Sequence, residues 1–142
     1  MSKLFIFLLI GSLALSAAAC GSGGTSTGNA GKTLKSGPAG NNLTVTLSNS
    51  DGVLRKGQQD FSLTFADASG KPVDVGAVAL NFFMPAMGSM AAMNAASTFK
   101  TTSTPGVYSG STDIEMTGEW QAQITYDGPA GKGKATLSVT AQ

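Results

Sequence analysis

Apolar and polar residues alternate with a period of two in several separate segments of the chain. Residues 43–47 (LTVTL) and 61–65 (FSLTF) each place an apolar side chain at every second position. Because successive side chains of a β-strand point to opposite faces, this alternation predicts strands with one buried face and one solvated face. The same pattern predicts strands at 78–82 and 137–139, and its longest run is 120–126 (WQAQITY).

Turn-forming residues separate these predicted strands. Pro105 and Gly106 suit a type II turn, because proline fixes φ at the second position and glycine supplies the positive φ at the third. That turn predicts a hairpin between residues 97–103 and 107–112. The other turn signals are Asn49-Ser50-Asp51-Gly52, Ala68-Ser69-Gly70-Lys71-Pro72 and Asp127-Gly128-Pro129.

The number and length of the predicted strands indicate the fold class. About seven short strands fall within about 100 residues, and Trp120, the one tryptophan, lies on one of them. We expect an all-β domain over residues 42–142, an immunoglobulin-like β-sandwich of about seven antiparallel strands. No long helical periodicity competes with this interpretation.

The first 19 residues have the organisation of an export signal. Lys3 provides a short positive segment, residues 4–10 (LFIFLLI) form an apolar core, and small residues follow at 16–19. The whole apolar stretch, about sixteen residues, is shorter than the roughly 20 needed for a permanent membrane-spanning helix. We therefore expect residues 1–19 to act as a signal peptide that is removed on export.

Cys20, the only cysteine, follows this segment directly. An exported chain with one cysteine cannot form an internal disulfide, so the thiol is free, intermolecular or modified. The run Ala17-Ala18-Ala19-Cys20 resembles the lipobox of bacterial lipoproteins, which implies that Cys20 becomes a lipidated N-terminal residue. The alternative is ordinary cleavage near Ala19, which leaves a free thiol. Gly21 stands where an aspartate signals inner-membrane retention in enterobacteria, which favours the periplasmic side of the outer membrane.

The segment after Cys20 has the composition of a linker. Residues 21–41 consist largely of Gly, Ser, Thr and Asn, which predicts that residues 20–41 form a lipidated, flexible tether with a reach of about 25 Å. Nine basic and eight acidic residues give a formal net charge of +1, and removal of Lys3 with the signal would leave eight of each. Electrostatic attraction therefore does not select the partner, and nothing indicates nucleic-acid binding.

Several residue types that carry common chemistry are missing. The chain contains no histidine and no thiol other than that of Cys20. Zinc and Cu(II) sites therefore lack their usual ligands, and Ser-His-Asp or Cys-His catalytic groups cannot form. No glycine-rich phosphate-binding loop is present either. We predict a binding protein and not an enzyme.

A methionine recurs at every third position within residues 82–94 (FFMPAMGSMAAMN), and outside this run the chain has only Met1 and Met116. Thioethers are soft, uncharged donors that select Cu(I), and by the same softness Ag(I), over hard or borderline ions. The spacing aligns all four side chains only in a conformation with three residues per turn, such as polyproline II or a 3₁₀-helix.

The residues between the methionines favour a loop over such a regular conformation. Pro85 fixes its own φ and biases the preceding residue away from helix, while Gly88 loosens the chain. The alanines at 91–92 and 95–96 could add one short helical turn after the loop. We expect Met84, Met87 and Met116 to converge as the metal ligands, with Met90 and Met93 as auxiliary donors.

The methionine run also has an interpretation without metal. Methionine fills irregular gaps in cores and forms adaptable contact surfaces, so the run could pack on the domain or dock on a protein partner of the cell envelope. Trp120 likewise has two interpretations, a cation–π contact with a bound ion or an ordinary core position. The residues alone leave these alternatives open.

Three motifs, in this order and spacing, resemble the YtkA-like domains: Met84-Pro85-Ala86-Met87-Gly88, Thr104-Pro105-Gly106-Val107-Tyr108 and Met116-Thr117-Gly118-Glu119-Trp120. They place the resemblance at about residues 42–141. It implies an extracytoplasmic β-sandwich, related in shape to FixH-like and CopC-like proteins, that handles copper for an efflux or oxidase-assembly partner. Ser89 and Met90 stand where other versions have a histidine, which favours Cu(I) over Cu(II).

Overall fold

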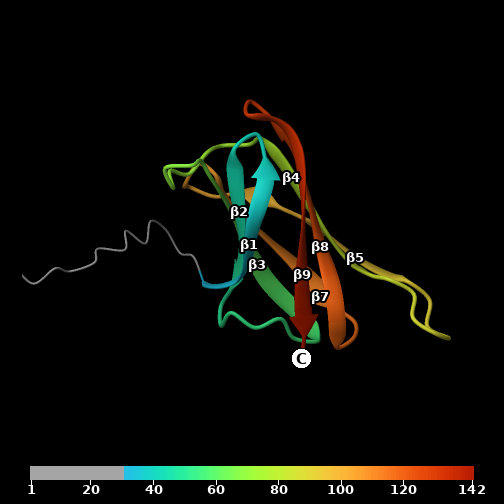
Figure 1. Ribbon diagram of the computed structural model, residues 1–142. Helices are drawn as coiled ribbons and strands as arrows, with labels where there is room; N and C mark the ends of the chain where they lie inside the picture. The colour runs from blue at the N-terminus through green and yellow to red at the C-terminus, as the bar shows by residue number, and fades with distance from the viewer. Residues whose placement is uncertain (1–30) are drawn as a thin grey trace, which may run out of the picture.

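The computed structural model describes residues 31–142, and this part of the chain contains strands, turns and loops but no helix (Figure 1). The predicted all-β class is confirmed. The predicted signal peptide, the predicted lipidation site Cys20 and residues 21–30 of the predicted tether lie outside the described residues. The strands are β1 (Lys32–Gly40), β2 (Leu43–Asn49), β3 (Gly57–Ala66), β4 (Ala77–Met84), β5 (Met93–Thr98), β6 (Lys100–Thr101), β7 (Val107–Ile114), β8 (Gly118–Gly128) and β9 (Gly131–Ala141).

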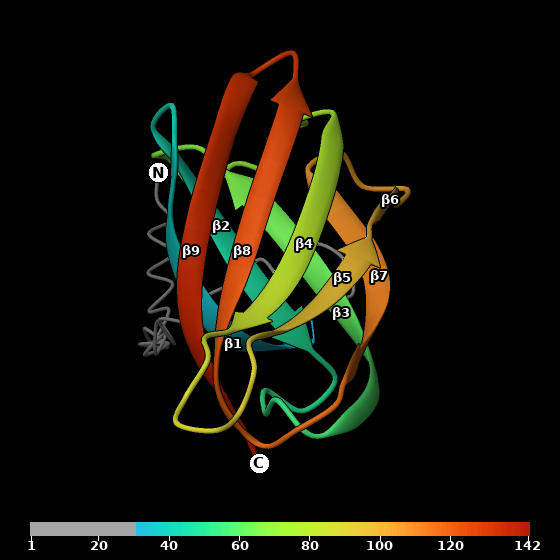
Figure 2. The same ribbon diagram turned by 90° about the vertical axis from the view of Figure 1, so that its right-hand side faces the viewer.

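The strands form two antiparallel sheets that pack face to face as a β-sandwich (Figure 2). One sheet has the order β1-β2-β3-β7-β6, and the other has the order β5-β4-β8-β9. The described part of the chain has nine strands where the sequence predicts about seven. The difference arises because β1 and the two-residue β6 carry no apolar alternation that a sequence pattern could reveal.

The predicted alternation corresponds to the core between the two sheets. On β8 every second residue from Trp120 to Tyr126 is buried, and β2, β3, β4 and β9 follow the same rule. Aromatic rings link the sheets: the ring centroids of Phe61 and Phe82 are 5.2 Å apart, and Phe65 lies edge-on to Tyr126 at 5.3 Å. Since burial of one such side chain contributes roughly 1.5–3 kcal/mol, these rings are a major source of cohesion between the sheets.

The tether is predicted to extend to residue 41, and strand β1 shows that its last part is ordered. Lys32 pairs with Asn49 and Gly40 pairs with Leu43, so this segment forms an edge strand of the first sheet. Most of its side chains are exposed and Ala39 is the buried one, which explains a composition typical of a linker. The segment is ordered by backbone hydrogen bonds to β2, which leave little trace in the sequence.

The chain changes sheets after β5, which corrects the predicted hairpin between residues 97–103 and 107–112. Ser97 belongs to β5 in one sheet, whereas only Lys100–Thr101 pairs with β7 in the other. The buried side chain of Phe99 lies between these two strands along the chain. Burial of this ring at the crossover leaves a two-residue strand in place of the expected long one.

The turn predicted at Pro105 is confirmed. Gly106 has a φ of 81°, and the N–H of Val107 donates to the carbonyl of Thr104 at 3.2 Å, as a type II turn requires. The turn also packs tightly on the preceding loop, because a Cβ on Gly106 would lie 2.7 Å from the backbone nitrogen and oxygen of Val73. Glycine is therefore needed here for both conformation and space.

The hydroxyl of Tyr108 connects β7 to the loop before β4. It accepts a hydrogen bond from the N–H of Val75 at 2.9 Å and donates one to Asp74 Oδ1 at 2.8 Å. Burial raises the pKa of Tyr108, and the hydrogen bond to the Asp74 carboxylate adds to this effect. In turn, the N–H of Gly76 and the Tyr108 hydroxyl lower the pKa of Asp74.

Replacement of Tyr108 by Phe should lower the free energy of unfolding by about 1–3 kcal/mol, because the buried N–H of Val75 loses its acceptor. Urea unfolding of the wild type and of Tyr108→Phe measures the difference. Ser109→Ala, a change at an exposed position on the same strand, is the control and should have little effect.

The sign of the pH dependence follows from the raised pKa of Tyr108. In the unfolded chain the phenol ionises near its ordinary pKa of 10.0, whereas the folded chain holds it neutral to a higher pH. The stabilisation from the neutral phenol is therefore complete below pH 10.0 and is lost as the pH rises through the raised pKa. The stability difference between wild type and Tyr108→Phe should therefore shrink as the pH rises above 10.0. A difference that stays constant would contradict the assignment.

Candidate metal site

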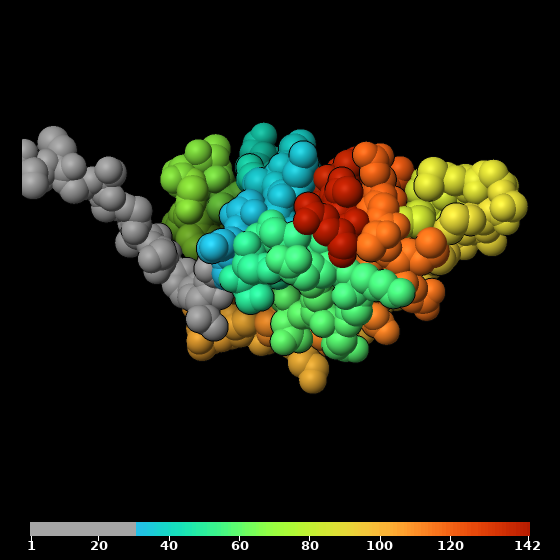
Figure 3. Space-filling model, turned by 90° about the horizontal axis from the view of Figure 1, so that it is seen from below, coloured from blue at the N-terminus to red at the C-terminus, as the bar shows by residue number. Residues whose placement is uncertain are grey.

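The connection between β4 and β5 projects from one end of the sandwich, where it is coloured yellow in Figures 1 and 3. We call residues 84–93 the methionine hairpin. Met84 is the last residue of β4 and Met93 is the first residue of β5. At the tip, the N–H of Met87 donates to the carbonyl of Met90 at 3.1 Å, and the N–H of Met90 donates back at 2.9 Å. Gly88, with a φ of 57°, allows the chain to reverse between them.

The hairpin register divides the four methionines into two cross-strand pairs. Met84 lies opposite Met93, and Met87 lies opposite Met90. Both pairs form because the chain reverses between Gly88 and Ser89, so that residues at equal distances from this point face each other. The three-residue spacing of the methionines therefore fits the cross-strand register of a hairpin and not a helix with three residues per turn.

This geometry corrects one local prediction and redistributes the candidate ligands. The alanines at 95–96 belong to β5, so no helical turn forms there. Met87, which the sequence groups with Met84 and Met116, is paired instead with Met90 at the tip. The symmetry of the methionine spacing about Gly88-Ser89 is the sequence signal that could have indicated this register.

The first group of methionines is buried in the core or packed against it, and we call Met84, Met93 and Met116 the inner set. Met84 is 2% exposed, and its Cε is 3.1 Å from the position that a Cβ on Gly118 would occupy. Met93 and Met116 are partly buried and pack against the core. Met84 and Met116 therefore both lie near the start of β8, within packed surroundings, and their role as metal ligands stays a prediction.

Trp120 lies beside the inner set and occupies a core position. Its side chain is 1% exposed, and its indole Nε1–H donates to the backbone carbonyl of Met116 at 3.0 Å. This hydrogen bond fixes the loop that carries Met116 to the start of β8. The structure thus gives Trp120 a packing role, and the predicted cation–π contact with an ion stays a prediction.

The second group is the tip pair, Met87 and Met90. Their side chains are 55% and 39% exposed, and they are the large apolar residues that remain exposed in the described part of the chain. Between Asp74 and Lys100 the sequence contains no charged residue. The tip pair therefore offers two soft, neutral sulfur donors to solvent with no nearby charge along the chain to attract hard cations.

Harder ligands do not gather elsewhere among the described residues. Within 31–142 no group of three or more His, Cys, Asp or Glu side chains is placed to hold a metal ion. No helix in this range is long and apolar enough to cross a membrane.

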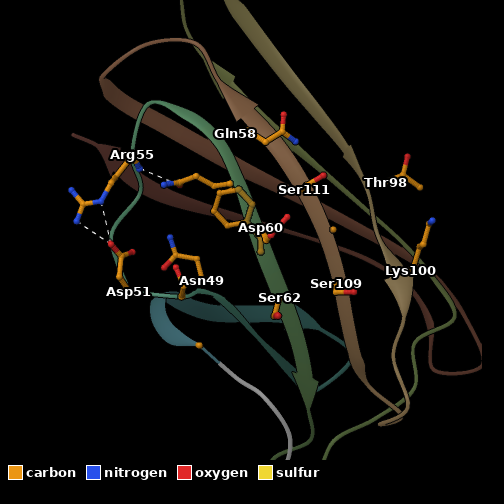
Figure 4. Close-up of a pocket in the computed structure, with 15 residues that line it drawn as sticks. Asn49, Asp51, Arg55, Gln58, Asp60, Ser62, Thr98, Lys100, Ser109 and Ser111 are labelled. Carbon is orange, nitrogen blue, oxygen red and sulfur yellow. Dashed lines mark hydrogen bonds and ion pairs between the residues drawn. The ribbon is translucent and has the colours of Figure 1, made fainter.

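A polar hollow that the sequence pattern does not predict lies over β3 and β7, on the outer face of the first sheet (Figure 4). Its volume is about 1010 Å³. Arg55 at its edge forms an ion pair with Asp51 at 2.9 Å, and this hydrogen-bonded guanidinium lowers the pKa of the Asp51 carboxyl. The labelled lining residues are Asn49, Asp51, Arg55, Gln58, Asp60, Ser62, Thr98, Lys100, Ser109 and Ser111.

Comparison with known proteins gives a match to a protein family. Residues 39–125 match the family model described as YtkA-like, a range that includes the methionine hairpin, the turn at Pro105, Met116 and Trp120. No curated protein and no solved structure matches the chain. The match agrees with the resemblance of the three sequence motifs and ends within β8.

Proposed function

Because the chain belongs to the YtkA-like family, we propose that it is a non-enzymatic binding protein of the cell envelope that handles Cu(I) or Ag(I). The methionine hairpin is the metal site. The tip pair, Met87 and Met90, supplies the accessible ligands, and the inner set supplies auxiliary sulfur donors. This assignment shifts the primary role toward the tip, since Met84 is almost completely buried.

The observation that carries the proposal is the cross-strand pairing of Met87 with Met90. Residues that exchange both backbone hydrogen bonds have Cα atoms about 5.5 Å apart and side chains on the same face of the ribbon. Two flexible thioethers in that arrangement can reach one ion together. Thioethers bind without losing a proton and select soft monovalent ions, so the proposed site works over a wide pH range.

The wider cellular assignment depends on the sequence. We propose that Cys20 carries a lipid anchor on the periplasmic side of the outer membrane, and that the partner is an envelope protein of metal efflux or oxidase assembly. We also propose that the two-sheet sandwich is immunoglobulin-like, with the FixH-like and CopC-like relationship that the motifs imply. These assignments place the hairpin in a compartment where it can meet exported copper.

Copper titration tests the proposed function directly. A chain of residues 21–142, which omits the thiol of Cys20, is titrated with Cu(I) in competition with a chromogenic Cu(I) chelator. The matched control replaces all five methionines of the hairpin and inner set by leucine, because leucine retains apolar bulk but removes sulfur. We expect the wild type to withdraw Cu(I) from the chelator and the control not to do so. Equal behaviour of the two proteins would rule out the thioether site.

A second candidate function is favoured by the exposure of the tip. An uncharged projection with exposed Met87 and Met90 is also suited to docking on an apolar groove of another envelope protein, since methionine adapts to varied contact surfaces. This candidate requires no metal. It becomes the better explanation if the wild type fails to bind Cu(I).

A further inference from the structure

The two sheets have four edge strands: β1 and β6 in one sheet, and β5 and β9 in the other. An edge strand presents unpaired backbone N–H and C=O groups that can pair with another chain. Proteins commonly prevent such pairing with lysine, proline, β-bulges, very short strands or a covering segment. The four edges of this domain differ sharply in these protective features.

Three of the edges are protected. Strand β1 carries Lys32, Lys35 and Pro38, and its register with β2 shifts at two places. Strand β6 is only two residues long and contains Lys100. Strand β9 carries two exposed lysines, and β1 of the other sheet packs beside it. Lys132 and Lys134 are those two residues.

Strand β5 (Met93–Thr98) has none of these features over its first four residues. It contains no charge and no proline, and its register with β4 runs without a shift from Met93 to Thr98. The exposed residues Asn94 and Ala96 are small and neutral. Nothing on this strand opposes the approach of a second extended chain.

Only the first part of this edge is open. At its C-terminal end, Ser97 Oγ donates to the carbonyl of Ser111, and the Thr98 carbonyl lies so close to Gly110 that a Cβ there would be 2.7 Å from it. Strand β7 therefore covers Ser97 and Thr98. The open segment is Met93–Ala96, which continues into the exposed arm of the methionine hairpin.

We propose that β5 pairs antiparallel with β5 of a second copy of the chain, so that two four-stranded sheets join into one. An antiparallel pair of identical strands satisfies two-fold symmetry, because each residue meets in the partner the residue that meets it in return. Self-pairing also brings identical charges together, and β5 avoids this repulsion since residues 75–99 carry no charge. A four-residue contact buries less area than a standard stable interface, so the dimer is weak and depends on concentration.

The test uses the full chain, extracted from membranes in mild detergent and examined by sedimentation velocity over a wide range of protein concentration. We expect the wild type to shift from monomer to dimer as the concentration rises. Ala96→Lys, at an exposed position of β5, should remain monomeric because a charged side chain on the open part of the edge opposes pairing with a second strand. Thr136→Lys, at an exposed position of β9, is the matched control and should dimerise as the wild type does.

Further variants decide where the contact lies. Asn94→Lys should also abolish the dimer, and it replaces Ala96→Lys if the latter fails to fold by circular dichroism. A double change of Met87 and Met90 to Gln should leave the dimer intact, because these residues lie outside β5. A wild type that stays monomeric, or a dimer that survives both lysine changes on β5, would overturn the proposal. A dimer lost only in the Gln variant would place the contact at the hairpin tip and also overturn it. None of these outcomes depends on whether copper binds.

Discussion

Replacement of Trp120 by Ala should lower the free energy of unfolding by about 3–5 kcal/mol. The side chain is 1% exposed and is the largest residue in the core between the sheets. Its removal leaves a large cavity, and the Met116 carbonyl loses the indole hydrogen bond that it accepts at 3.0 Å. Because a domain is typically stable by only about 5–15 kcal/mol, the variant should unfold at a much lower concentration of urea.

Two further variants separate the contributions of Trp120. Trp120→Phe retains an aromatic ring but cannot donate to Met116, so it should fall between wild type and Trp120→Ala. Thr125→Ala, on an exposed position of β8, should have almost no effect. If Trp120→Ala lowered the free energy of unfolding as little as Thr125→Ala, the described packing of the two sheets around Trp120 would be wrong.

The core strands could be predicted because their burial repeats along the sequence. Strands β2, β3, β4, β8 and β9 each bury every second side chain over several residues, and this leaves an alternation that a single sequence displays. The turn at Pro105 and Gly106 could also be predicted, since proline and glycine restrict the backbone in opposite ways. In both cases the side chains themselves carry the structural information.

The elements that were not predicted are stabilised by interactions that leave no pattern in the side-chain sequence. Strand β1 is ordered by backbone pairing with β2, although Ala39 is its buried side chain. The switch of sheets at Phe99 depends on which strand lies nearby in space. The polar hollow over β3 and β7 is built from side chains far apart in sequence, with no shared motif.

The methionine site lies between these two cases. The ligand types and their concentration in one segment are visible in the sequence, but their grouping depends on the hairpin register. A reversal between Gly88 and Ser89 pairs Met87 with Met90, whereas a register shifted by one residue would pair Met87 with Ser89 or with Ala91. The register thus decides which sulfur atoms meet, and local conformational preferences at Pro85 and Gly88 were insufficient to predict it.

The division of the methionines into a tip pair and an inner set leads to a prediction with a large effect on affinity. In the double variant Met87→Leu with Met90→Leu, the affinity for Cu(I) should fall by at least about tenfold, which requires a loss of only ~1.4 kcal/mol. The change should leave folding intact because both side chains are exposed. The measurement is competition with a chromogenic Cu(I) chelator, as for the wild type.

The matched triple variant changes Met84, Met93 and Met116 to leucine. It should retain most of the Cu(I) affinity, because Met84 must leave the core before its sulfur can bind an ion, and this exposure costs free energy. Trp120, the only tryptophan, provides a second readout, since it lies beside the inner set and far along the hairpin from the tip. Ions held at the tip should leave its fluorescence nearly unchanged. Strong quenching, together with a loss of affinity confined to the triple variant, would instead place the metal in the inner set and make the tip pair a surface for docking.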